Sequence, residues 1–334
     1  MGLCLGRPQM LPPNHFCANE SLADPLEVLH QSSLSSHGLK CYSFGELNIA
    51  TQKFSSHNTL LGVGSYGSVF RGWIDQKTLA PSKPGVGVVV AVKMFTRSLY
   101  GLDQDWESDA KCLELGQLQH TNLVRLIGYC LDSEKRFLVY EFMGNGNLGN
   151  HLFEGGEVMS WSIRMRIAVG VARGLSFLHS LSEHVVYRED LSTENILLDS
   201  DFNAKLSDFG HTHFSGYAKY LNLNHQRMWT IRKRFGSSPE QMLTGQTTQK
   251  SDVYGFGMVL LELLSGRKLW GEFAKLIRNS ATPFVMIMDP KLLDVYPIED
   301  AKVALTIAYQ CVHSRPTTRP TMAHVLSELE NLLN

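Results

Sequence analysis

The spacing of three polar residues near the middle of the chain constrains its fold more than any other feature. Asp190 precedes Asn195 by five positions, and Asp208 follows thirteen positions later. Two short apolar runs, 196–198 and 204–206, flank a polar turn and predict a β-hairpin that would bring the three side chains to one end. A carboxylate that can face a hydroxyl, beside an amide and a second carboxylate as hard oxygen ligands for Mg²⁺, is what phosphoryl transfer requires.

A glycine-rich segment lies well upstream of these residues. Gly62, Gly64 and Gly67 stand among apolar residues, a pattern that suits a strand–turn–strand whose backbone N–H groups approach phosphates closely. The same spacing opens dinucleotide-binding folds, but in those a helix follows the glycines directly. Residues 69–74 have the character of a strand, so the sequence favours a phosphate-covering hairpin.

A lysine closes the next predicted strand. Residues 87–93 are mostly β-branched and end in Lys93. An interior lysine is costly to bury unless an anionic group pairs with it, and nucleotide phosphates are the natural candidate. The alternative is a solvated lysine at the end of the strand, which the glycine-rich segment upstream argues against.

Taken together with these motifs, further segments make the chain resemble the plant receptor-like cytoplasmic kinases over about residues 42–333. The segments match that family's middle strands and hinge, its long helix before the catalytic loop, and two signatures of its C-terminal lobe. They are 120–130, 137–143, 161–179, 251–257 and 319–322.

The resemblance implies the bilobal α+β protein-kinase fold, with a small antiparallel β-sheet and one helix in the N-lobe and a mostly helical C-lobe. It also implies that Glu240 pairs with Arg319 to hold the C-lobe together. We expect a flexible N-terminal segment over residues 1–41, a lead-in helix over 42–59 and a kinase domain over 60–333. Within the kinase domain, the N-lobe is expected over 60–140, the hinge over 141–146 and the C-lobe over 147–333.

The same resemblance implies a Ser/Thr protein kinase that uses ATP and Mg²⁺ and has a protein substrate or a receptor kinase as its partner. Asp190 would orient the substrate hydroxyl and Lys93 would contact phosphate as the catalytic residues. Asn195 and Asp208 would hold the metal. The residues expected to bind ATP are Leu61, Gly62, Gly64, Gly67, Val69, Ala91, Lys93, Glu141, Met143 and Asn195.

Four departures from the family pattern bear on activity, and the first concerns a helix. The glutamate that should pair with Lys93 falls on Lys111, where a like charge would be repulsive. Glu107 or Glu114, on the same helical face, could replace it. Alternatively, both glutamates form surface pairs with Lys111 worth a few tenths of a kcal/mol.

The second departure is an acidic residue in the catalytic loop. Glu189 stands between Arg188 and Asp190, where the family has Arg directly before Asp. Either Glu189 is inserted, or the arginine that binds activation-loop phosphate has become acidic and would repel it. A further hypothesis pairs Glu189 with basic residues of that loop, and Glu189→Arg should then alter the dependence on phosphorylation. The candidate partners are Lys219, Arg232 and Lys233.

The remaining departures affect transfer and substrate docking. Ser192 replaces the catalytic-loop lysine, and losing one such charge stabiliser costs on the order of 10²–10³ in rate. Arg232 and Lys233 occupy the position of the Gly-Thr segment that shapes the peptide platform. We therefore expect nucleotide binding to survive better than turnover. An impaired kinase and an inactive pseudokinase, acting as scaffold or decoy, both remain open.

The N-terminus fits a lipid anchor. Gly2 could carry a myristoyl group and Cys4 a palmitoyl group, and two chains are needed for stable anchoring. Gly6 departs from the Ser or Thr that the motif prefers, and a plain flexible N-terminus is the alternative. The expected location is the cytoplasmic face of the plasma membrane or the cytoplasm.

The charge and the cysteine content of the chain limit the kinds of ligand and partner that we expect. A net charge of −1 gives no case for nucleic acid, and the six cysteines show neither disulfide nor metal-ligand spacing. His211 and His213 are expected to be solvated loop imidazoles, because no completed ligand set accompanies them. Cys112 and Cys130 are expected to be small core residues.

Overall fold

The structure is a computed structural model of the whole chain, which divides into two units, Met1–Gly38 and Leu39–Asn334. The described helices and strands all belong to the second unit. The described residues are 38–64, 67–95, 117–132, 135–154, 157–181, 191–207, 237–244, 247–269, 283–292 and 295–333.

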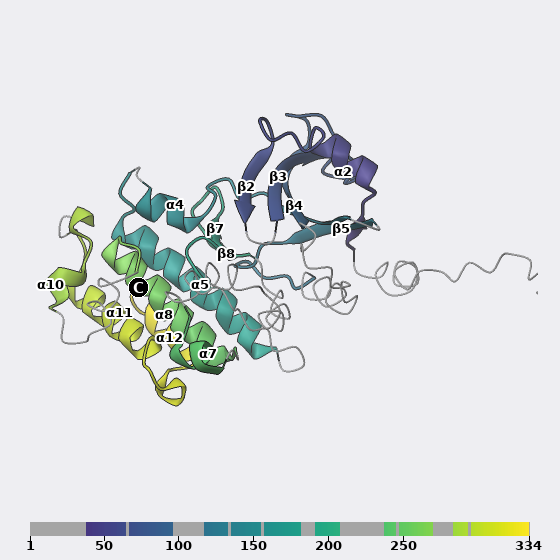
Figure 1. The fold of residues 1–334 in the computed structure, drawn as a ribbon. Coiled ribbons are helices and arrows are strands. Elements are labelled where there is room, and N and C mark those ends of the chain that lie inside the picture. The colour runs from purple at the N-terminus through teal and green to yellow at the C-terminus, as the bar shows by residue number, and fades with distance from the viewer. Residues whose placement is uncertain are drawn as a thin grey trace, which may run out of the picture. The chain divides into compact units, whose positions relative to one another are not determined.

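A six-stranded sheet occupies the N-terminal part, in the order β1-β5-β6-β4-β3-β2 (Figure 1). All neighbouring strands pair antiparallel except β1, which runs parallel to β5. The antiparallel sheet expected from the sequence is thus confirmed, with a parallel edge strand that was not predicted. The strands are β1 (Lys40–Cys41), β2 (Leu60–Gly64), β3 (Gly67–Ile74), β4 (Val88–Phe95), β5 (Leu126–Asp132) and β6 (Lys135–Glu141).

Helix α2 (Phe44–Ala50) precedes β2 in the chain. Ser43 and Glu46 form a capping box that satisfies the first backbone N–H groups of the helix. The helix ends at Ala50, because the backbone of residues 52–54 takes positive φ angles. The helix therefore covers only part of the lead-in segment, 42–59, that was expected from the sequence.

One face of the sheet is packed against a hydrophobic core. Val90 and Val92 of β4 are fully buried there with Phe137 and Val139 of β6, and Leu47 of α2 belongs to the same core. Because side chains alternate along a strand, the residues between these valines lie on the opposite face. That opposite face carries the candidate site.

The hairpin expected around the polar turn is confirmed. β7 (Ile196–Leu198) pairs antiparallel with β8 (Ala204–Leu206) in the expected register, Ile196 opposite Leu206. Asp199 accepts hydrogen bonds from the backbone N–H groups of Asp201 and Asn203, both at 2.9 Å, and this shapes the turn.

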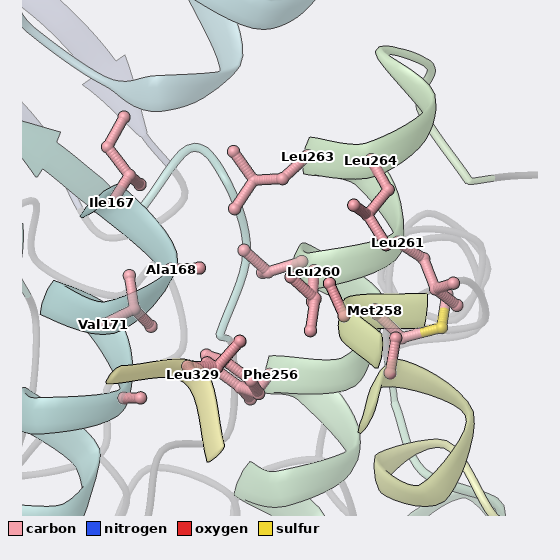
Figure 2. Close-up of a cluster of buried hydrophobic side chains, with 14 of the residues drawn as sticks. Ile167, Ala168, Val171, Phe256, Met258, Leu260, Leu261, Leu263, Leu264 and Leu329 are labelled. Carbon is pink, nitrogen blue, oxygen red and sulfur yellow. The ribbon is translucent and has the colours of Figure 1, made fainter. Parts of the chain in front are cut away.

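The C-terminal part is helical. The long helix expected before the catalytic loop is confirmed as α5, and it packs with the apolar helix α8 and with α12 around one core. Figure 2 shows part of this core, with Ile167, Ala168 and Val171 on α5 and Leu260 and Leu263 on α8 across from them. The helices are α4 (Leu148–Phe153), α5 (Trp161–Ser180), α7 (Pro239–Thr244), α8 (Gln249–Ser265), α10 (Phe284–Ile287), α11 (Ile298–Cys311) and α12 (Met322–Glu330). Two 3₁₀ turns, η3 (Pro290–Leu292) and η4 (Pro316–Thr318), complete this part. Across the part of the chain that the structure describes, no helix is long and apolar enough to cross a membrane.

Two buried arginines tie these helices together. Arg319 binds both carboxylate oxygens of Glu240, which confirms the pair that the resemblance implied. Arg164 of α5 binds Asp289 at 2.6 Å and also donates to the carbonyls of Met159 and Leu263. Each guanidinium therefore has several acceptors, the condition under which a buried charge is tolerated.

Candidate active site

The glycine-rich segment forms the strand–turn–strand that the sequence favoured over a dinucleotide fold. β2 and β3 pair antiparallel, with Gly64 opposite Gly67. Gly67 has φ +144°, and a Cβ atom built there would lie 1.9 Å from the carbonyl oxygen of Met94 on β4. A side chain is thus excluded at Gly67 by the neighbouring strand. At Gly62 a Cβ atom would meet nothing within 4 Å.

Predicted binding residues share the sheet face opposite the core. Val69 of β3 lies directly opposite Lys93 of β4, and Ala91, two residues before Lys93, lies on the same face. From the other side, Leu138 and Tyr140 of β6 lie opposite Lys93 and Ala91. We call this set, Val69, Ala91, Lys93, Leu138 and Tyr140, the lysine face.

Lys93 is only 8% exposed although it points away from the hydrophobic core. Its ammonium nitrogen lies 5.3 Å from the centroid of the Phe95 ring. A buried lysine on the strand that pairs with β3, close to Gly67 where a side chain is excluded, suits a phosphate-bearing ligand, since phosphate supplies the opposite charge. The residues present therefore fit a nucleoside triphosphate.

The hinge, residues 141–146, begins at the last residue of β6. Met143 is buried, and the N–H of Gly146 donates to its carbonyl oxygen at 3.1 Å in a turn with positive φ at Gly146. The hinge is bound to β7, because the N–H of Asn145 donates to the carbonyl of Leu198 and the N–H of Leu198 donates to that of Gly146. The expected nucleotide-binding hinge is thus attached to the hairpin.

The side chain of Glu141 forms a further contact with that hairpin. Its Oε1 accepts hydrogen bonds from the Nζ of Lys205 on β8 and from the backbone N–H of Arg125, both at 2.9 Å. Lys205 and Glu141 are 17% and 22% exposed, so the ion pair is largely shielded from water. Glu141 was expected at the site from the sequence, and Lys205 was not.

The described half of the catalytic loop, residues 191–195, is held from several sides. Thr193 is 1% exposed, its carbonyl accepts the N–H of Gly149, and its hydroxyl donates to Glu262 on α8. The backbone and hydroxyl of Ser207 both donate to the carbonyl of Asn195. Asn195 thus lies at the open end of the hairpin, beside the residue that precedes Asp208 in the chain.

An acidic cluster beside this loop was missed by the sequence analysis. Lys268 pairs with Glu194, and Glu262 accepts the backbone N–H of Leu269. Burial, reinforced by the charge of Glu194, raises the pKa of Glu262 to about 7. Burial opposes ionisation of Glu194 too, but its hydrogen bond with Lys268 prevails and lowers the pKa of Glu194. A lone glutamate in the apolar run 258–264 was the available signal.

Of the residues that the sequence analysis singled out, several lie outside the described part of the chain. They include two of the three polar residues around the hairpin, all departures from the family pattern except Ser192, the two loop histidines and the candidate lipidation sites. These are Asp190, Asp208, Glu107, Lys111, Glu114, Arg188, Glu189, Lys219, Arg232, Lys233, His211, His213, Cys112, Gly2 and Cys4. Ser192, the third departure, is described and is half-buried; Cys130 is buried in the N-terminal core, as expected.

Known proteins match this arrangement along most of the chain. Residues 56–329 match the family described as protein tyrosine and serine/threonine kinase. The chain is 43% identical to the probable serine/threonine-protein kinase PBL3 of Arabidopsis thaliana, over 97% of this chain and 77% of that protein. It is 44% identical to PBL2 of the same plant, over 94% and 76%.

A rice protein is similar to the same extent. Receptor-like cytoplasmic kinase 176 of Oryza sativa subsp. japonica is 42% identical, over 90% of this chain and 78% of that protein. The family match covers the glycine-rich segment, the hinge, the hairpin and the C-terminal helices. The chain therefore belongs to the plant receptor-like cytoplasmic kinases of the PBL family and is a Ser/Thr protein kinase by descent.

Proposed function

We propose that this kinase binds ATP with Mg²⁺ on the lysine face and transfers the γ-phosphate to protein Ser/Thr hydroxyls at a reduced rate. The observation that carries the binding proposal is the buried side chain of Lys93 on β4, the strand that pairs with β3 at Gly67, where a side chain is excluded. Bound Mg²⁺-ATP would supply the phosphoryl group and neutralise its developing charge.

Each named residue has a role in this proposal. Gly62, Gly64 and Gly67 cover the phosphates and Lys93 contacts them, while Asp190 orients the substrate hydroxyl. Asn195 and Asp208 hold the metal through an amide and a carboxylate oxygen, ligands that Mg²⁺ accepts. The base of the nucleotide lies among the remaining predicted residues: Leu61, Val69, Ala91, Glu141 and Met143.

Reduced turnover follows from Ser192. A hydroxyl at this position carries no positive charge, so the transferring phosphoryl group loses one electrostatic stabiliser. Ser192 lies two residues before Glu194, whose carboxylate is paired with Lys268. Lys111 carries a charge opposite to the one that the family pattern has at that position, and so does Glu189 where it replaces the arginine and is not an insertion. Such a reversed charge disturbs alignment more than binding.

The second candidate function is an inactive pseudokinase that acts as a signalling scaffold or decoy, with nucleotide as a structural ligand. The absence of a lysine at Ser192, within the described half of the catalytic loop, favours it. Lys93, Asp190 and Asp208, the lysine and the two aspartates that transfer needs, are retained in the sequence and argue for the active form.

We also propose a location and a domain layout. Lipid chains on Gly2 and Cys4 would anchor residues 1–41 to the cytoplasmic face of the plasma membrane, where a receptor kinase is the expected partner. The lead-in segment is 42–59 and the kinase domain is 60–333. The name of the similar rice protein, a receptor-like cytoplasmic kinase, supports the receptor-proximal setting.

A paired assay tests the proposed function. Mg²⁺-ATP at a hundredfold its dissociation constant should raise the free energy of unfolding by about 2.7 kcal/mol. Radiolabel transfer to a protein substrate is then measured beside Asp208→Asn. Stabilisation with transfer that the substitution abolishes supports the kinase, and stabilisation without transfer supports the pseudokinase. The absence of both effects would overturn nucleotide binding itself.

A further inference from the structure

The hinge and the β7–β8 hairpin are bound to each other at both ends of the hinge. At its far end, Asn145 and Gly146 exchange backbone hydrogen bonds with Leu198 of β7. At its first residue, the carboxylate of Glu141 binds Lys205 of β8. The hinge is where the nucleotide base is expected, and the hairpin carries Asn195, an expected metal ligand.

A third segment, residues 122–125, completes the connection between them. The N–H of Leu206 donates to the carbonyl of Asn122 at 2.9 Å, and the N–H of Val124 donates back to Leu206 at 3.0 Å. Arg125 and Glu141 are also joined, by a backbone bond of 3.0 Å from Glu141 and by the bond from Arg125 to the carboxylate. Glu141 therefore contacts Arg125 of this segment and also Lys205 of β8, the strand to which the segment is hydrogen-bonded.

We propose that Lys205 is a positioning residue: its ion pair with Glu141 fixes the spacing between the nucleotide base at the hinge and the metal end of the hairpin. Lys205 directly precedes Leu206 and Ser207, and Ser207 contacts Asn195. A change in the position of β8 along the hinge would therefore move the metal-binding end. The inference rests on the proposed function, because it assumes that Mg²⁺-ATP binds at this site.

The partial burial of the pair gives it enough strength for this role. An exposed ion pair is screened by water and contributes little, whereas these side chains are mostly covered. The carboxylate oxygen Oε1 accepts from two donors, one on the segment 122–125 and one on β8, and these two bonds fix the orientation of the side chain. Removing Lys205 leaves the bond from Arg125 in place but removes the direct side-chain contact between β8 and the first residue of the hinge.

The test compares ATP affinity with Mg²⁺ and with EDTA, for wild type, Lys205→Met, Glu141→Gln and the double variant. Methionine keeps the aliphatic stem, and glutamine keeps an acceptor for Arg125. Without metal, ATP uses the hinge and the lysine face; with metal, it also needs the end of the hairpin. A general loss of structure would weaken both affinities alike, so the ratio isolates positioning.

We expect Lys205→Met to lose about fivefold to tenfold in Mg²⁺-ATP affinity and less than about twofold in EDTA. Glu141→Gln changes a residue placed beside the base and is expected to lose affinity in both conditions, with the ratio of Mg²⁺-ATP to EDTA affinity falling by the same roughly fivefold to tenfold. In the double variant this ratio should fall no further than in the single variant with the larger change, because the two substitutions remove one interaction. Lys302→Met is the matched control, since it removes the exposed pair with Glu299 on α11, at 2.8 Å, and should change neither affinity.

The opposing outcomes are distinct. If wild type binds Mg²⁺-ATP and the variants keep the wild-type ratio, or if their losses add, the positioning role is overturned while the proposed function stands. If wild type itself fails to bind Mg²⁺-ATP, the proposed function falls and the inference falls with it.

Discussion

Arg319 and Glu240 meet through two parallel hydrogen bonds, Nη1 to Oε1 at 2.6 Å and Nη2 to Oε2 at 2.8 Å. The guanidinium also donates to the carbonyls of His313 and Lys250 and lies 4.9 Å from the Tyr254 ring centroid. Partial burial disfavours the charged carboxylate, but the bonds from Arg319 prevail and lower the pKa of Glu240 to about 2.

Replacing Arg319 should therefore be costly. Arg319→Lys keeps a positive charge but cannot serve both carboxylate oxygens and the two carbonyls, so we expect the free energy of unfolding to fall by about 3–5 kcal/mol. Urea denaturation measures the change. Arg173→Lys alters an exposed Arg–Glu pair and should cost less than about 1 kcal/mol. Equal losses of unfolding free energy in both variants would show that the buried Arg319–Glu240 ion pair contributes no more to stability than the exposed pair.

Glu262 gives the stability a pH dependence that can be isolated. Its pKa is raised from an ordinary 4.5 to about 7, so the folded state binds a proton that the unfolded state has lost. Stability from this group is fully present below pH 4.5 and is lost as pH rises through 7. We expect Glu262→Gln to remove a decline on the order of 2 kcal/mol between those values.

Denaturation curves at several pH values measure that decline, and subtracting the variant from wild type removes the contribution of the histidines. Glu299→Gln, at an exposed position on α11, is the control and should keep the wild-type profile. A wild-type slope that survives in Glu262→Gln would mean that another group titrates.

Two glycines of the same segment should respond differently to alanine. Gly67→Ala places a Cβ atom against the backbone of Met94 in a left-handed region, and should cost about 1–3 kcal/mol in unfolding free energy. Gly62→Ala meets nothing within 4 Å and should change stability by less than about 0.5 kcal/mol.

Mg²⁺-ATP affinity then separates structure from ligand contact at Gly62. If the phosphates approach this backbone closely, Gly62→Ala should weaken Mg²⁺-ATP binding by roughly tenfold, about 1.4 kcal/mol, at unchanged stability. Isothermal titration calorimetry gives the affinity and thermal denaturation the stability. Unchanged affinity in Gly62→Ala would place the phosphates away from this residue.

Ser192→Lys tests the proposed cause of slow transfer. Restoring a positive charge in the catalytic loop should raise kcat by on the order of 10²–10³, with little change in Mg²⁺-ATP affinity, because the charge acts on the transferring group. Ser200→Lys adds the same charge in the exposed hairpin turn and should have no effect on kcat. A kcat that stays at the wild-type value would point to Lys111, Glu189 or residues 232–233 as the limiting departure.

Local patterns predicted the local parts of the site. The hairpin was predicted because two apolar runs and the turn signal around Asp199 lie within a dozen positions. The strand after Gly67 was distinguished from a helix by the strand character of residues 69–74, which is also a local signal. The Glu240–Arg319 pair was obtained from family resemblance, which carries long-range information that periodicity lacks.

Contacts between distant segments were not predictable from one sequence. Arg164 and Asp289 are 125 positions apart, and Lys205 and Glu141 are 64 apart. Nothing in the spacing of such residues specifies which charges will meet, because the choice depends on how helices and strands pack. The parallel pairing of β1 with β5 was missed for the same reason, since two residues carry no period.

That two-residue strand has a consequence for self-association. β1 forms one outer border of the sheet and offers few backbone groups on which a second molecule could add a strand. It lies so close to β5 that a Cβ atom on Gly128 would be 2.3 Å from the carbonyl of Lys40. A chain trimmed to start at Ser43 would uncover the backbone of Gly128 and Tyr129, because Tyr42 also bonds to the carbonyl of Tyr129, and would become prone to aggregate through that border.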